Sequence, residues 1–130
     1  MTNRELYEAA LRLIAESTTE GDNADYEERT PYLLAVCAAE ASEIDRKMRI
    51  IRGLEAAPAY SPVYLSLDED FPLLPELAPA AIQYLGAMLI LESDESRSDI
   101  LYDRYCDTLL RLEESLPASL EPIADQYGSI

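Results

Sequence analysis

The stretch TPYLLAVCAAEASEIDRKMRII, residues 30–51, decides the fold class of this chain. Its apolar residues follow alternating spacings of four and three, so they form one stripe along a helix about 33 Å long. Pro31 either opens this helix, with Thr30 as its cap, or kinks a longer helix that begins near Tyr26. Gly53 is a natural terminator. The stripe consists of Thr30, Leu34, Cys37, Ala41, Ile44, Met48 and Ile51.

Three further segments have helical periodicity. The first runs from about Asn3 to Glu16 and opens with a capping-box pattern, Thr2 followed by Glu5. Another lies in PELAPAAIQYLGAMLILES, residues 75–93, and the last begins near residues 93–99 and ends before Pro117. We therefore predict an all-α fold with about four main helices in a small bundle. Its predicted core includes Leu34, Ala41, Ile44, Leu85, Leu101, Leu109 and Leu112.

Residues 54–74 interrupt this pattern and are predicted to form a long arm between the second and third helices. Pro58, Pro62 and Pro72 exclude a long helix there. A loop of this length without regular structure is uncommon in a compact domain and is usually functional. We predict a single helical domain, residues 1–116, that includes the arm, followed by a C-terminal tail, residues 117–130.

The charge of the chain excludes several kinds of partner. Its 130 residues include 26 acidic and 10 basic side chains and no histidine, for a formal net charge of -16. Such a chain repels phosphate backbones, so we expect no sequence-specific nucleic-acid binding. It also lacks a signal peptide and a long apolar run, so we expect a soluble, cytoplasmic protein with no membrane association.

The sequence offers little support for catalysis or metal binding. Neither acidic stretch has the ligand spacing, central glycine and distal glutamate of a calcium loop. Without histidine or a close cysteine pair, a zinc site is not expected, and Cys37 and Cys106 are predicted to be free thiols in the core. No glycine-flanked serine or phosphate-binding glycine pattern is present. We expect no enzymatic activity, no cofactor and no metal.

Apolar residues of the arm and the tail are the predicted contact residues. The arm contains too many of them for a plain solvent loop, so they need cover. A neighbouring subunit would supply it, in which case residues 65–73 matter more for assembly than for the fold. The alternative, that the side chains fold back onto their own helices, stays open for Phe71 and Leu74. The interface candidates are Tyr64, Leu65, Leu67, Phe71, Leu73, Ile123 and Tyr127.

Three segments resemble the small helical head–tail connector proteins, or neck adaptors, of tailed bacteriophages and prophages. The opening RELYEAALRLIAES, followed by DYEERTPYLLAVCAAEASEID, is similar to their first two helices. The later SLDEDFPLLPELAPAAIQYLGAMLILESDESRSDILYDRYCDTLLRL resembles their second half more closely, and the closing IADQYG also fits.

The resemblance covers most of the chain and rests on pattern rather than on an invariant motif. It implies a non-enzymatic structural subunit of a ring that joins portal to tail. The implied partners are further copies of the chain, portal, and tail or neck proteins. The implied location is the bacterial cytoplasm during assembly and the virion neck afterwards. The alternative is an acidic regulatory protein-binding module, either a DNA mimic or an antitoxin-like protein.

Overall fold

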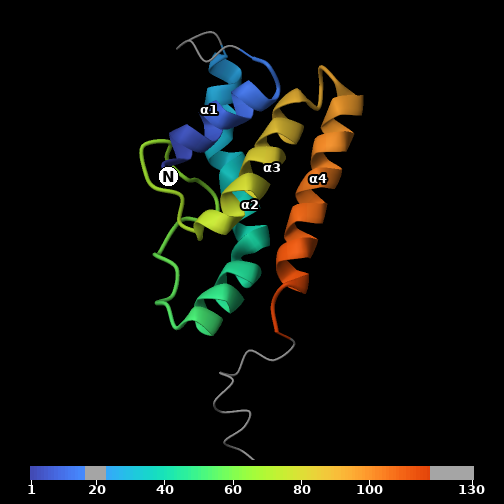
Figure 1. Ribbon diagram of the computed structural model, residues 1–130. Helices are drawn as coiled ribbons and strands as arrows, with labels where there is room; N and C mark the ends of the chain where they lie inside the picture. The colour runs from blue at the N-terminus through green and yellow to red at the C-terminus, as the bar shows by residue number, and fades with distance from the viewer. Residues whose placement is uncertain (17–22, 118–130) are drawn as a thin grey trace, which may run out of the picture.

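The fold is a bundle of helices with one long irregular segment at its side (Figure 1). The computed structural model describes residues 1–16 and 23–117. Within them the only strand-like pairing is an isolated bridge between Thr2 and Asp70, so the prediction of an all-α fold is confirmed. The helices are α1 (Asn3–Leu13), α2 (Ala24–Arg52), α3 (Ala78–Ile90) and α4 (Glu95–Glu114), with a short 3₁₀ turn, η1 (Pro75–Leu77), before α3.

The ends of α1 follow from local chemistry. Both halves of the expected capping box are present, between the side chains and backbone N–H groups of Thr2 and Glu5. The helix ends earlier than expected because Ala15 adopts a left-handed conformation, with φ of 60°. The N–H of Glu16 then donates to the carbonyl of Leu11 at 2.8 Å, which satisfies a carbonyl at the helix end.

The longer of the two alternatives for α2 is correct, because the helix begins at Ala24 and continues through Pro31. Proline removes one backbone donor. Beside this position the hydroxyl of Thr30 donates to the carbonyl of Tyr26 at 2.7 Å, and the carbonyl of Pro31 accepts from the N–H of Leu65 in the arm at 3.0 Å. Gly53 ends the helix as predicted, in a left-handed conformation.

Helix α3 is the centre of the bundle and contacts α1, α2 and α4. Gly86 lets the side chains of Ile14 and Leu101 lie close against the backbone of α3, since a Cβ at this position would lie 3.3 Å from a methyl group of each. Small residues let this helix pack closely against its neighbours. Ala80, Ala81, Gly86 and Ala87 are all buried.

Most of the predicted core is buried, with two corrections. Five of the seven predicted core residues, Leu34, Ala41, Ile44, Leu85 and Leu101, are at most 6% exposed. Leu109 and Leu112 pack only partly buried at the edge of the core, because the second half of α4 has few neighbours. Cys37 is a buried free thiol as predicted, whereas Cys106 is free but exposed, so its assignment to the core was wrong.

Candidate protein-binding surfaces

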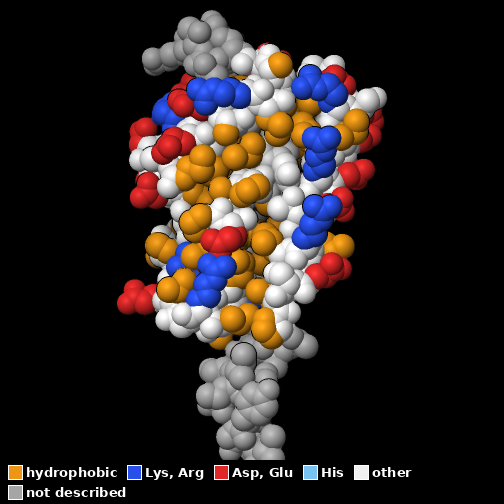
Figure 2. All heavy atoms as spheres, viewed as in Figure 1, with side chains coloured by type: hydrophobic (Ala, Val, Ile, Leu, Met, Phe, Trp, Pro, Cys, Tyr) orange, Lys and Arg blue, Asp and Glu red, His pale blue; other side chains and the backbone are white. Residues whose placement is uncertain are grey.

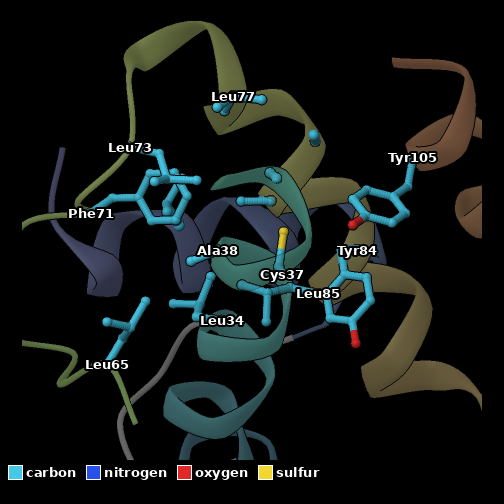
Figure 3. Packing of buried hydrophobic residues seen from close by; sticks show 14 of the residues in the cluster. Leu34, Cys37, Ala38, Leu65, Phe71, Leu73, Leu77, Tyr84, Leu85 and Tyr105 are labelled. Atoms are coloured by element: carbon cyan, nitrogen blue, oxygen red, sulfur yellow. The ribbon is translucent and has the colours of Figure 1, made fainter. Parts of the chain in front are cut away.

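The inner face of the arm belongs to the core of its own chain. Figure 3 shows Leu65, Phe71 and Leu73 turned toward Leu34 and Ala38 of α2. The interpretation that a neighbouring subunit covers these side chains is therefore corrected, and the fold-back alternative holds for Phe71 and Leu74. The buried arm residues, each at most 9% exposed, are Leu65, Leu67, Phe71, Leu73 and Leu74.

The first turn of α1 fixes one stretch of the arm. The backbone N–H groups of Asn3 and Arg4 donate to the carbonyls of Glu69 and Leu67, at 2.9 and 3.0 Å. N–H groups in the first turn of a helix have no partner within the helix, so the arm supplies acceptors that α1 lacks. The buried side chain of Asn3 adds a third bond, from its Nδ2 to the carbonyl of Ser66 at 2.8 Å.

A buried ion pair on α2 fixes both ends of the arm. Asp45 accepts from Nε of Arg49 and from the N–H of Leu74, at 2.8 and 2.7 Å. Arg49 also donates to the carbonyls of Glu55 and Pro72, each at 3.2 Å. Buried charges are tolerated when they are paired and hydrogen-bonded, and here each nitrogen of the Arg49 guanidinium and each oxygen of Asp45 has a hydrogen-bond partner. Arg49 lies in the last turn of α2, where a cation complements the helix dipole, and its hydrogen bonds also hold the arm.

The outer face of the arm exposes apolar side chains. Val63 is 65% exposed, and Tyr64 packs edge-on against Tyr32 of α2, with ring centroids 5.2 Å apart. Val36 lies one helical turn after Tyr32 and is also exposed. We call Tyr32, Val36, Val63 and Tyr64 the arm patch. The backbone N–H groups of Val63 and Tyr64 donate to the hydroxyl of Ser61, and the N–H of the next residue, Leu65, donates to Pro31 of α2. This apolar surface is therefore held in place without contributing to the core.

Helix α4 carries a row of arginines along the flank that faces α3. Arg97, Arg104 and Arg111 are seven residues apart, which places them on one side of the helix. We call these three residues the arginine row. Basic side chains accordingly follow α4 along the right of Figure 2. Arg97 approaches Asp94 at 3.9 Å, whereas Arg104 and Arg111 make no ion pair with any residue that the structure describes.

The opposite flank of α4 borders a groove between α2, α3 and α4, with a volume of about 340 Å³. Beneath it, the hydroxyl of Tyr105 donates to Oε1 of Glu40 at 2.7 Å, and its ring lies 5.0 Å from that of Tyr84. Burial raises the pKa of Tyr84 to about 12 and raises the pKa of Tyr105 as well. We call this feature the tyrosine groove; its lining is Glu40, Tyr84, Met88, Leu91, Ser98, Asp99 and Tyr102.

A further pocket of about 420 Å³ lies between the second half of α2 and the beginning of the arm. Its lining includes Asp45 and Arg49, and their polar groups bind the arm as described above. In the two described ranges, no three acidic, cysteine or histidine residues are grouped as metal ligands, and none of the helices is long and apolar enough to cross a bilayer.

The structure separates the predicted contact residues into three groups. Leu65, Leu67, Phe71 and Leu73 are buried, Tyr64 is exposed in the arm patch, and Ile123 and Tyr127 lie outside the described residues. The sequence reasoning did not identify the arginine row, although its seven-residue spacing was a readable signal. It also missed Tyr32 and Val36, which lie beside the predicted stripe of α2. Searches of protein-family models, curated proteins and solved structures found no match to this chain.

Proposed function

We propose that the protein is a non-enzymatic structural subunit of a head–tail connector ring in a tailed phage or prophage, where it joins portal to tail. The observation that carries the proposal is the arm patch. An irregular segment whose inner side chains fill the core and whose outer side chains form a fixed apolar surface is suited to binding another protein. The proposal takes the kind of assembly from the connector resemblance of the sequence.

The charge distribution supports the same proposal. A net charge of -16 keeps a polyanion such as DNA mobile beside the protein, as a neck through which DNA passes requires. A DNA mimic needs an unbroken acidic surface, and the arginine row interrupts the acidic surface of α4. In this proposal the subunit binds further copies of itself, portal, and tail or neck proteins, first in the bacterial cytoplasm and then in the virion neck.

The absence of catalysis is also part of the proposal. In the pocket between α2 and the arm, Asp45 and Arg49 bind each other and are also hydrogen-bonded to the arm. A carboxylate held in this way is a poor general base, because it is buried and each of its oxygens already accepts a hydrogen bond from the chain, which keeps it from a substrate. The tyrosine groove offers hydroxyl groups whose pKa is raised by burial, which opposes their use as bases near neutral pH.

The test is deletion of the gene from the phage or lysogen that encodes this chain, followed by complementation. Deletion should give DNA-filled heads without tails, seen by electron microscopy, and wild-type protein should restore infectious particles. Val63→Asp/Tyr64→Asp should fail to restore them while keeping its thermal stability, because both side chains are exposed. Ala59→Asp, an exposed change in the same arm, is the matched control.

Complete particles after deletion would contradict the proposed function. Recovery of the chain from cell extract in a stable complex with a DNA-binding protein or a toxin, together with normal particles, would favour the acidic regulatory alternative.

A further inference from the structure

We propose that copies of this chain join head to tail through the two flanks of α4, with the arginine row of one copy seated in the tyrosine groove of the next. The inference deepens the proposed function, on which it rests only for the expectation that the contacts close into a ring. The association itself is argued from the surfaces of the chain.

The first observation is the presence of free cations on a strongly acidic chain. Asp107 lies within one helical turn of both Arg104 and Arg111, yet neither arginine forms an ion pair with it or with any other described residue. Exposed ion pairs contribute little within one chain, so leaving them unmade costs little. Two unpaired guanidinium groups on one side of α4, two helical turns apart, nevertheless give a binding surface for carboxylates.

The second observation is that the tyrosine groove has the complementary chemistry. Glu40 and Asp99 lie in its lining, and neither forms an ion pair in the part of the chain that the structure describes. The ring of Tyr102 is partly exposed beside them and lies 5.7 Å from that of Tyr105. Arginine stacks on aromatic rings and forms bidentate bonds with carboxylates, so this combination suits a guanidinium group.

Apolar side chains match in the same way. Ile100 lies one turn before Arg104 and is 53% exposed, beside the arginine row. The tyrosine groove contains Met88 and the exposed Leu91. A contact that combines an apolar centre with charged groups at its rim is typical of protein interfaces.

The geometry of α4 makes the contact heterologous. Residues two apart on a helix point about 160° away from each other, so Tyr102 and Arg104 occupy opposite flanks. The first flank is joined to α3 through the hydrogen bond of Thr108 to Gln83, and the second flank is joined to α2 through that of Tyr105 to Glu40. A copy that binds one neighbour through each flank generates a ring when the rotation closes and a filament when it does not.

The test uses two complementary variants of the full chain. Arg104→Glu/Arg111→Glu reverses two of the three charges of the arginine row but keeps the groove, and Glu40→Gln/Asp99→Asn removes the carboxylates of the groove but keeps the row. Glutamine at position 40 retains an acceptor for the hydroxyl of Tyr105. Native mass spectrometry and sedimentation velocity at low salt should show wild-type oligomers, and each variant alone should have at least about tenfold weaker association.

Mixing the two variants distinguishes this head-to-tail contact from a two-fold symmetric contact, in which both copies use the same surface. One intact row and one intact groove remain in the mixture, so it should form a one-to-one dimer and nothing larger. Arg12→Glu is the matched control, because Arg12 lies on α1 and also has no ion pair among the described residues. That change should leave the oligomers of the wild-type chain intact.

Three outcomes would overturn the proposal. The first is a wild-type chain that stays monomeric at about millimolar concentration, where even a contact of about −4 kcal/mol is half formed. The others are variants that associate as the wild-type chain does, and a mixture of the two variants that forms no dimers. Tailless heads after gene deletion combined with a failed mixing test would reject this contact but keep the proposed function. Complete particles after gene deletion combined with a successful mixing test would reject the proposed function but keep this contact.

Discussion

The arm and the second half of α4 reverse the usual relation between regular structure and burial. Between residues 65 and 74 the chain has no helix or strand, yet its leucines and Phe71 are buried. Between residues 106 and 114, α4 is regular, yet none of its side chains is fully buried. A segment is buried because other elements leave room beside it, and periodicity alone does not provide that room.

The largest expected effect is the release of the arm from α2. Asp45→Ala should lower the free energy of unfolding by about 4 kcal/mol, because it leaves Arg49 without its anion and the N–H of Leu74 without an acceptor. Urea titration followed by circular dichroism measures the change. Glu43→Ala, which removes an exposed carboxylate paired with Arg46, should leave the midpoint almost unchanged. Equal effects of the two changes would show that the arm does not depend on the buried pair.

The next effect comes from the inner face of the arm itself. Leu65→Ala should cost about 3 kcal/mol, the usual loss for truncating a fully packed leucine. Val63→Ala, two residues away on the outer face, should be close to neutral in the same titration. A loss below about 1 kcal/mol for Leu65→Ala would restore the interpretation that the arm serves assembly rather than the fold.

A smaller effect is expected in the second half of α4. Leu112→Ala should cost about 1 kcal/mol because the side chain is only partly buried, whereas Leu101→Ala in the first half of the same helix should cost about 3 kcal/mol. Both values come from the same denaturant titration. If the two losses were equal, the second half of α4 would be as well packed in solution as the arm.

The smallest change in stability near neutral pH concerns two buried groups beside Tyr105 of α4, the thiol of Cys37 and the hydroxyl of Tyr84. Burial raises the pKa of Cys37 and of Tyr84 to about 12, from ordinary values near 9 and 10. Since the unfolded chain releases these protons more readily, this stabilisation is complete below about pH 8 and is lost progressively as the pH rises toward 12. The loss should stay below about half a kcal/mol at pH 8.5 and grow above pH 10.

Urea midpoints across that pH range, together with tyrosinate absorbance, measure this alkaline loss. Stability that stayed constant to pH 11 would show that Cys37 and Tyr84 ionise freely in the folded chain. The core beside Tyr105 of α4 would then be as open to solvent as the second half of that helix.

The sequence by itself determined the helices, because helix formation is a local property. The stripe of α2, the capping box of Thr2 and Glu5, and the terminator Gly53 each depend on residues within a few positions of one another. The same signals predicted the buried Leu34 and Leu85. They failed for Cys106 and Leu109, because periodicity shows which residues share a face but not how far a neighbouring helix covers it.

Only the tertiary structure decided the fate of the arm. Its proline-rich sequence has no period from which a buried face is readable, and its partners are distant in the chain. Asp45 binds the N–H of a residue 29 positions away, and Asn3 binds a carbonyl 63 positions away. The small side chain of Ala38 on α2 is fully buried where the arm packs. The burial of Phe71 and Leu73 therefore followed from the space between helices, which no local pattern encodes.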